Sequence, residues 1–355
     1  MSFKISTVKL QDMVVRSMRG VGNNKLLPIT SLMNISISEG KLVLITTDGV
    51  NYMYIKEPVE VDEDFYVTVE ADKFSKLISK MTCEDIVLEL KDTYLQVRGN
   101  GVYKIDLPLD FTVNYPDPMN NKNTLESIAF LDLSTVKDIL FYIKPSLATT
   151  MEIPCYTGYY MHDSVIATDT NKIACLDTEV FEQPKLVSAE MMDMLSVMTD
   201  DTIEVFSNDE SIAFVTEHCC VYGDLMAYIN DFQIDAINKL LENKFNSRCE
   251  VARNALLQCL DRLSIFVGAY DSNLIHMNFE EDCITIFSKS ADAYESVPYL
   301  NSEDVETFDC YIDIQMLQSQ VKSQENDSVD IRFGERNSIM LCDGDVTKMI
   351  ALASD

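Results

Sequence analysis

The fold is decided by a block that first occurs at residues 74–108. It reads Phe74-Ser-Lys-Leu-Ile-Ser-Lys-Met81, then Asp85-Ile-Val-Leu-Glu-Leu90, then Tyr94-Leu-Gln-Val97. The first segment has the apolar spacing of a helix, whereas the next two alternate as half-buried antiparallel strands do. Ile86, Leu88 and Leu90 fall on one face of the first strand, and Glu89 falls on the other. The block therefore predicts a helix followed by two short strands.

The same block occurs twice more, starting near Ala189 and near Ile314. The acids that open its first strand are 116 and 126 positions apart, at Asp85, Asp201 and Asp327. A second block, a helix and a hairpin with an acidic turn, interleaves with the first. Its apolar markers are 123 and 119 positions apart, at Leu42, Val165 and Ile284. A common period of about 120 residues exceeds that of solenoid repeats, so we expect three similar α+β domains, each of two strand-helix-strands units.

We expect the domains at residues 1–122, 123–243 and 244–355. The polar stretch Asn114–Asn123 is typical of a linker, and the second linker is expected near Glu242–Asn246. The repeat also predicts six helices, at residues 9–19, 72–80, 134–144, 188–198, 252–262 and 314–322.

The charge is unevenly distributed along the chain. The formal net charge is −30, which by itself argues against a nucleic-acid ligand. The six expected helices, however, sum to +5, so the remainder carries −35. If the helices line one surface, that surface can hold a DNA duplex through its phosphates. The candidate DNA-facing residues are Arg16, Arg19, Lys25, Lys73, Lys76, Lys80, Lys137, Lys144, Arg253, Arg262 and Lys322.

Ordinary solvated helix faces are the competing interpretation of these bases, because Lys and Arg favour helices in any case. The helix expected at 188–198 carries no base at all, and we interpret its methionines as core.

The composition also argues against membrane, secreted and zinc-binding classes of protein. No apolar run is long enough for a membrane helix, and the first residues do not have the pattern of a signal peptide. The ten cysteines include no C-x-x-C pair, and the adjacent Cys219 and Cys220 cannot form half of a zinc site. We therefore expect reduced core thiols in a cytoplasm, with no metal and no cofactor.

An enzyme is the weakest of the alternatives. The three histidines, His162, His218 and His276, fall in different repeats, and no phosphate-binding, nucleophile-elbow or zinc-protease motif occurs. His218 and Cys219 are neighbours on an expected strand, so their side chains point to opposite faces. We expect no catalytic residue.

The arrangement resembles the bacterial-type β sliding clamp family of DNA polymerase III over essentially the whole chain. Three segments carry the resemblance: Leu26-Leu-Pro-Ile-Thr-Ser-Leu-Met-Asn34 leading into Gly40-Lys-Leu-Val-Leu-Ile-Thr-Thr-Asp-Gly49, then Ala167-Thr-Asp-Thr-Asn-Lys-Ile-Ala174, and Leu256-Leu-Gln-Cys-Leu-Asp-Arg-Leu-Ser-Ile265. The acidic charge and the absence of Trp suit a phage or divergent bacterial version.

The resemblance implies a clamp fold with helices lining a ring and antiparallel sheets outside. It implies a homodimer that closes head to tail around duplex DNA, is opened by an ATP-driven clamp loader, and tethers a replicative polymerase. The alternative is a clamp-fold adaptor between proteins that does not encircle DNA.

The resemblance also implies a groove for partner peptides. Its expected residues are Tyr156, Thr168, Thr170, Asn171, Lys172 and Ile173, with Ile234, Ile350 and Leu352 as weaker candidates; core packing is the competing interpretation of Ile173, Ile350 and Leu352. Two departures lie at this groove. The family's Gly-His-Arg is replaced by Thr170-Asn171-Lys172, and its usual ending is replaced by Ala351-Leu-Ala-Ser-Asp355.

By the same alignment, the dimer seam would bring Tyr103 and Ile105, on an edge strand, against Ile265 and Phe266. Apolar residues on an open edge invite aggregation unless a partner covers them. A head-to-tail contact of this kind gives a closed ring only if the rotation per subunit fits.

Overall fold

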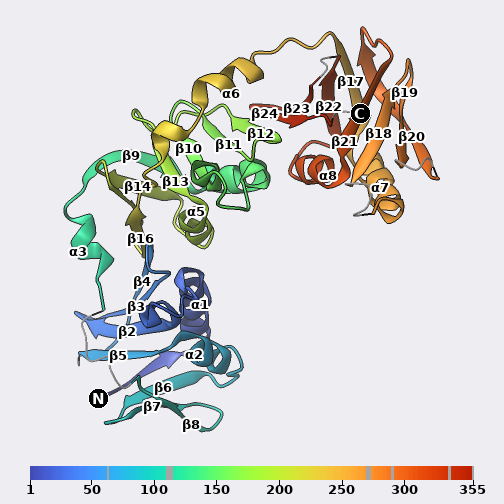
Figure 1. The fold of residues 1–355 in the computed structure, drawn as a ribbon. Coiled ribbons are helices and arrows are strands. Elements are labelled where there is room, and N and C mark those ends of the chain that lie inside the picture. Colours follow the sequence, from blue (N-terminus) through green and yellow to red (C-terminus); the bar gives the residue numbers. More distant parts are fainter. Residues whose placement is uncertain (62–63, 109–114, 269–272, 289–291, 335–336, 354–355) are drawn as a thin grey trace. The chain divides into compact units, whose positions relative to one another are not determined.

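The structure is a computed structural model that describes residues 1–61, 64–108, 115–268, 273–288, 292–334 and 337–353. These residues form two compact units. The first contains Met1–Lys137 and Glu190–Leu225, and the second contains Asp138–Ala189 and Met226–Asp355. Each unit consists of antiparallel sheets and short helices (Figure 1), which is the α+β class that the repeat predicted.

The first unit has an eight-stranded sheet in the order β5-β2-β3-β4-β16-β15-β14-β9 and a four-stranded sheet in the order β1-β6-β7-β8. Its strands are β1 (Ser2–Ser6), β2 (Leu32–Ser38), β3 (Lys41–Thr47), β4 (Tyr52–Pro58), β5 (Phe65–Glu70), β6 (Asp85–Leu90), β7 (Tyr94–Arg98), β8 (Val102–Asp106), β9 (Glu126–Asp132), β14 (Thr202–Ser207), β15 (Ser211–Val215) and β16 (Cys219–Asp224).

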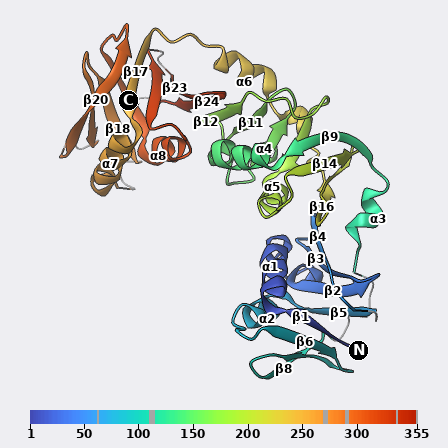
Figure 2. The ribbon, with the colours of Figure 1, turned by 180° about the vertical axis from the view of Figure 1, so that it is seen from behind.

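The helices that lie wholly or mainly in the first unit are α1 (Thr7–Ser17), α2 (Ala71–Ile78), α3 (Pro118–Lys122), α4 (Leu133–Asp138) and α5 (Ala189–Leu195). Figures 1 and 2 show α1, α2 and α5 on one side of the eight-stranded sheet and α3 on the other.

The second unit has one twelve-stranded sheet, in the order β13-β10-β11-β12-β24-β23-β22-β17-β20-β19-β18-β21. Its strands are β10 (Gly158–Met161), β11 (Val165–Thr168), β12 (Lys172–Leu176), β13 (Lys185–Ser188), β17 (Ser247–Ala252), β18 (Leu274–Phe279), β19 (Cys283–Ser288), β20 (Tyr294–Glu303), β21 (Phe308–Asp313), β22 (Ser328–Phe333), β23 (Ser338–Asp343) and β24 (Val346–Ala351).

The helical elements of the second unit are the π-helical turn η3 (Ile139–Ile143), α6 (Ile234–Leu241), α7 (Arg253–Leu263) and α8 (Ile314–Lys322). In both views η3, α7 and α8 lie on one side of the sheet and α6 lies on the other (Figures 1 and 2). Among the described residues, every helix is too short or too polar to span a bilayer.

All six predicted helices are confirmed, as α1, α2, α4 with η3, α5, α7 and α8. Two further helices were not predicted. Helix α3 lies inside the expected first linker, where the Asp117 carboxylate accepts a hydrogen bond from Met119 N and Pro118 opens the helix. A proline at the first position is preorganised for a helix, so this short polar stretch is ordered despite its composition.

Burial follows the predicted strand alternation. Ile86 and Leu88 of β6 are fully buried, whereas Val87 between them and Glu89 after them are half-buried. Met191, Met192 and Met194 of α5 are also buried, which confirms that this methionine stripe is core.

In the described residues each third of the chain contributes eight strands, β1–β8, β9–β16 and β17–β24. Neighbouring thirds are joined through their sheets. Strand β4 pairs with β16, with Tyr52 opposite Tyr222, and β12 pairs with β24, with Ile173 opposite Met349.

Candidate functional site

The predicted DNA-facing bases lie on or just after the predicted helices, apart from Lys25, which lies in a turn, and all but one of them are accessible. Arg16 is buried in α1, where its guanidinium pairs with Asp12 at 2.9 Å and with Glu57 of β4 at 3.5 Å. The arginine points into the sheet because position 16 lies on the same helix face as buried Met13. The prediction that Arg16 faces DNA is therefore corrected, because its side chain is buried and already pairs with two carboxylates.

The other ten candidates are accessible. Arg253 is half-buried and donates to Gln324 O at 2.7 Å, while the remaining nine are exposed: Arg19, Lys25, Lys73, Lys76, Lys80, Lys137, Lys144, Arg262 and Lys322.

Several of these exposed bases have acidic neighbours. Lys76 pairs with Asp72 at 2.7 Å, and Arg262 forms a bidentate pair with Glu295 at 2.6 and 2.8 Å. Within the described residues no carboxylate pairs with Arg19, Lys25, Lys73, Lys80 or Lys137. These five side chains are available to an external anion such as a phosphate.

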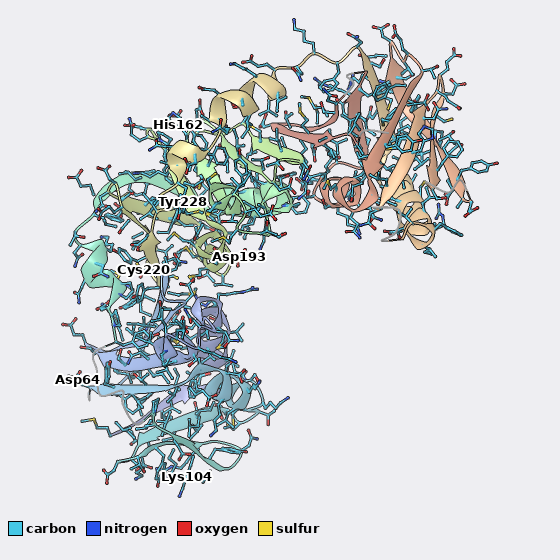
Figure 3. The ribbon with its side chains drawn as sticks, viewed as in Figure 1. Asp64, Lys104, His162, Asp193, Cys220 and Tyr228 are labelled. Carbon is cyan, nitrogen blue, oxygen red and sulfur yellow. The ribbon has the colours of Figure 1, made fainter. Side chains whose placement is uncertain are left out.

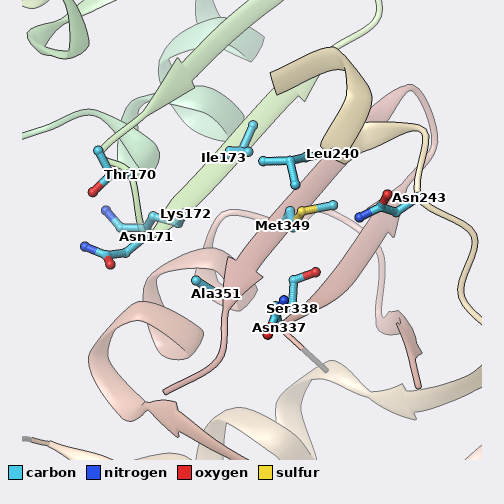
Figure 4. Close-up of a pocket in the computed structure, with 10 residues that line it drawn as sticks. All are labelled: Thr170, Asn171, Lys172, Ile173, Leu240, Asn243, Asn337, Ser338, Met349 and Ala351. Atoms are coloured by element: carbon cyan, nitrogen blue, oxygen red, sulfur yellow. The ribbon is translucent and has the colours of Figure 1, made fainter. Parts of the chain in front are cut away.

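A pocket of about 160 Å³ opens beside the β12–β24 pairing (Figure 4). Ile173, Leu240 and Met349 point toward one another and give it an apolar floor. The other lining residues are Thr170, Asn171, Lys172, Asn243, Asn337, Ser338 and Ala351. Four predicted groove residues, the consecutive run from Thr170 to Ile173, are thus brought together on one pocket.

The turn before β12 shapes this pocket through local hydrogen bonds. The Asp169 carboxylate accepts from Asn171 N at 3.0 Å and from Lys172 N at 2.9 Å, and the Thr168 hydroxyl accepts from Thr170 N at 3.1 Å. These bonds hold Thr170 at a φ of 79°, a left-handed conformation that is strained for a β-branched residue. Thr170 therefore stands at a position where glycine is the least strained residue.

Lys172 is fixed rather than free. Its ammonium pairs with Asp169 at 2.8 Å and donates to Pro145 O at 2.6 Å. The same lysine also lines a second hollow of about 420 Å³, walled by Leu140, Leu147, Ala148 and other residues. Lys172 consequently forms part of the wall of both hollows.

The remaining groove candidates lie away from the pocket lining. Ile350 is fully buried and Leu352 packs partly buried in the core under α7 and α8. Their neighbours Met349 and Ala351 line the pocket instead, because successive residues of β24 point to opposite faces. Met349 could have been predicted from that alternation along β24. Leu240 could have been predicted by recognising the helix α6.

Tyr156, Thr168 and Ile234 are close to the pocket without lining it. Tyr156 is buried in the apolar cluster that contains Ile173 and Met349, and Ile234 is partly buried against that cluster. Thr168 is buried, and its hydroxyl donates to Lys172 O at 2.8 Å.

The four predicted seam residues differ in exposure. Ile265 and Phe266 follow α7 and are 79% and 52% exposed, and Tyr103 on β8 is 38% exposed. Ile105 is instead buried in the first unit, because it lies on the core face of β8 opposite Leu95. Three of the four residues are therefore open to a partner.

His218 and Cys219 do not form an activated nucleophile. His218 Nδ1 lies 2.9 Å from Asp200 Oδ1, but burial raises the pKa of the neighbouring Cys219 thiol to about 12. A thiol with that pKa is protonated and inert at neutral pH. No cluster of metal-binding side chains occurs among the described residues.

Comparison with known proteins identifies the fold. Residues 1–117 match the family model described as the DNA polymerase III beta subunit, N-terminal domain. No curated protein sequence matches the chain. Among solved structures, the chain is similar to the DNA polymerase III beta subunit of Borrelia burgdorferi at 15% identity and a TM-score of 0.88, covering 100% of this chain and 99% of that one.

Two further structures agree along the whole chain. The beta subunit from the DNA polymerase of Streptococcus pyogenes is 17% identical with a TM-score of 0.86, covering 100% of both chains. The DNA polymerase sliding clamp from Bacillus subtilis is 16% identical with a TM-score of 0.84, covering 100% of this chain and 99% of that one. These matches confirm the fold class and the resemblance stated from the sequence.

Proposed function

We propose that this chain is a DNA sliding clamp, a processivity factor that encircles duplex DNA, tethers a replicative polymerase and performs no chemistry of its own. The observation that carries the proposal is the clamp fold over the whole chain, with exposed bases, five of them without a carboxylate partner among the described residues, on or near its helices. The amino-terminal family match supports the same assignment.

The mechanism we propose is topological. Lys73, Lys80 and similar exposed bases contact phosphates, which carry no sequence information, so the protein slides along any duplex. A closed ring needs few such contacts, because it cannot dissociate sideways. The remaining acidic surface repels DNA and confines the duplex to the basic helices.

We further propose that the chain has three domains, at residues 1–122, 123–243 and 244–355, and that two copies form a ring of six. The eight strands in each third support this division, as does the recurrence of one kind of sheet junction between neighbouring thirds. The exposed side chains of Ile265 and Phe266, in the last third of the chain, support one half of the proposed contact between two copies. The exposed side chain of Tyr103, in the first third, supports the other half.

The pocket beside β12 and β24 is proposed as the docking site for short peptides of the polymerase and of the ATP-driven loader. Its apolar floor of Ile173, Leu240 and Met349 suits an aliphatic or aromatic peptide side chain. The amides of Asn171, Asn243 and Asn337 at its rim offer hydrogen bonds to a peptide backbone. We propose a bacterial cytoplasm or a phage-infected host as the setting in which the protein meets these partners.

The test is retention on DNA of different topology. The chain is incubated at high concentration with a nicked circular plasmid, so that rings open and reclose spontaneously, and is then gel-filtered in high salt. A clamp stays with the circle and is lost when the same plasmid is linearised. An adaptor that only keeps the fold is retained on neither, and that result would refute the proposal.

A further inference from the structure

Strand β9 carries two exposed apolar side chains at one end of the eight-stranded sheet. It is the last strand of that sheet, and among the described residues it pairs only with β14 (Figure 1). Phe130 is 68% exposed, more than any other described phenylalanine, and Ile128 is 37% exposed. Leu131 is the one buried residue of this strand. Single exposed apolar residues are ordinary on a protein surface, but an adjacent pair with a large aromatic ring is typical of a binding surface.

A β-bulge directs this pair outward. The register between β9 and β14 shifts between Val205 and Phe206, which leaves Ile128 without a residue opposite it. Bulges occur at sheet edges, where they turn a side chain away from the regular ladder. The exposure of Ile128 therefore follows from the backbone of β9 and does not depend on a side-chain rotamer.

A carboxylate is held beside the apolar pair. Glu204 of β14 lies directly opposite Phe130, and its Oε1 accepts a hydrogen bond from the Ser127 hydroxyl at 2.8 Å. Glu126 and Asp132 are exposed at the two ends of β9. Within the part of the chain that the structure describes, no Lys or Arg pairs with these three carboxylates. The apolar pair is thus bordered by acidic groups whose charge an external cation can neutralise.

The neighbouring part of the first unit is acidic as a whole. Residues 190–225 contain nine carboxylates and no Lys or Arg, and they include most of α5 and the whole of β14, β15 and β16. Asp193 and Cys220, which Figure 3 labels, belong to this segment. Such a surface repels the phosphates of nucleic acids and of anionic membranes, and it attracts a basic protein segment. The charge therefore selects the class of partner.

The same face of β14 already shows how a cation contacts one of its rings. Lys122 of α3 places its Nζ 3.6 Å from the centroid of the Phe206 ring. Phe206 follows Glu204 by two residues, so both side chains project from one face of the strand. In the described ranges no cation lies over the Phe130 ring. Phe130 and Glu204 therefore offer a second position of this kind, with a carboxylate next to the ring.

We propose that this face of β9 is a docking surface for a basic segment of another protein. A Lys or Arg of that segment lies over the Phe130 ring and beside Glu204, and an aliphatic or aromatic side chain covers Ile128. The surface belongs to the first unit, whereas the pocket beside β12 and β24 belongs to the second, so the two sites are separate. The proposal does not depend on the clamp function, and plasmid retention tests that function independently.

Three short labelled peptides test the chemistry of the partner. They share Val and Tyr at alternate positions and carry Lys, Gln or Glu at the others. Binding to the full-length protein is followed by fluorescence anisotropy at physiological ionic strength, where charges more than about 8 Å apart are largely screened. The Lys peptide should bind, the Gln peptide should bind more weakly and the Glu peptide should not bind. Failure of the Lys peptide to bind, or equal binding of the Lys and Gln peptides, would overturn the proposal.

Substitutions show whether the Lys peptide binds at β9. Phe130→Ser should weaken binding by about 5-fold, because it removes the ring under the cation. Glu204→Gln keeps the shape of the side chain but not its charge, and should weaken binding by about 2-fold. Phe141→Ser is the matched control, since Phe141 is another exposed phenylalanine, at 44%, and lies in the second unit. It should bind as wild type does, and an equal loss in Phe141→Ser and Phe130→Ser would contradict the site.

Light scattering distinguishes a different protein from a second copy of this chain as the occupant. Phe130→Ser should have the same mass as wild type over a range of concentrations. A lower mass for the variant would assign this face of β9 to a contact between copies and would overturn the proposed partner.

Discussion

Lys348 Nζ donates a hydrogen bond to Ser323 Oγ at 2.6 Å, just beyond the carboxyl end of α8. The same nitrogen donates to the carbonyls of Gln320, at 3.1 Å, and of Ser323, and lies 5.7 Å from the centroid of the Tyr142 ring. The lysine is fully buried beneath the helix. A cation at this end of a helix is favourable, but burial is not. Burial lowers the pKa of Lys348 to about 7, and nearby Asp343 only partly opposes the shift.

This shift predicts how stability depends on pH. The folded-state pKa is below the ordinary value of 10.5, so between about pH 7 and 10.5 the unfolded chain binds more protons than the folded one. Stability from this group therefore rises with pH through that window and is lowest below pH 7. Urea midpoints of wild type and Lys348→Met at pH 7 and 10 measure the effect. Between pH 7 and pH 10 the urea midpoint of wild type should rise relative to that of the variant. The variant is the control because it keeps the same acidic residues, including Asp343 and Glu325.

Thr170→Gly should stabilise the protein by about 0.5–1 kcal/mol. The substitution removes left-handed strain of about 1–2 kcal/mol, and the added chain entropy of glycine offsets part of it. Asn171→Gly, one residue along the same turn, has no positive φ to relieve and should destabilise. Chemical denaturation of the three proteins measures both signs. A loss of stability in Thr170→Gly would mean that the threonine contributes more than its strain.

Phe266→Glu should make the chain monomeric. The side chain is 52% exposed beside Ile265, and a carboxylate there would be desolvated at the proposed seam. Light scattering over a range of concentrations gives the mass, with one chain at 40.2 kDa. Phe130→Glu is the matched control, because Phe130 is 68% exposed on β9 and outside the seam. An unchanged dimer mass for Phe266→Glu would count against the assigned seam.

Lys80 and Arg16 should separate DNA binding from stability. Lys80→Glu removes an exposed base, so DNA affinity should fall and the salt dependence of binding should drop by a slope of about 1. Arg16→Ala breaks the pairs with Asp12 and Glu57 and should cost about 2 kcal/mol of unfolding free energy while leaving DNA affinity unchanged. Fluorescence anisotropy of a labelled duplex and urea unfolding measure the two effects. Loss of DNA affinity in Arg16→Ala without unfolding would reverse this assignment.

The repeat and the helices could be predicted from sequence because burial imposes a period on each element. Strand β6 shows the period of two, and α8 begins and ends at the predicted residues. Helix α3 could not be predicted in this way, since it lacks an apolar face and depends on Asp117 and Pro118 for its start. The resemblance to a family predicted part of the site as well, because it gave Thr170, in the turn that shapes the pocket, as a groove residue.

The site residues were harder to assign than the fold. Arg16 looks like any helix base in sequence, and only the packing of α1 on β4 shows that Glu57 holds it. The sequence of β24 does not show whether Ile350 or Met349 lines the pocket, because a shift of one residue in register exchanges the two faces of the strand. Ile105 presents the same difficulty on β8.

The pairing of β12 with β24 also sets the order in which the protein can be completed during synthesis. Strand β12 is made well before β24, and its partner on that side does not exist until residues 346–351 have left the ribosome. A nascent chain therefore displays an open strand edge through the translation of nearly half its length. Such an edge is where chaperones would bind and where stalled or truncated chains would aggregate.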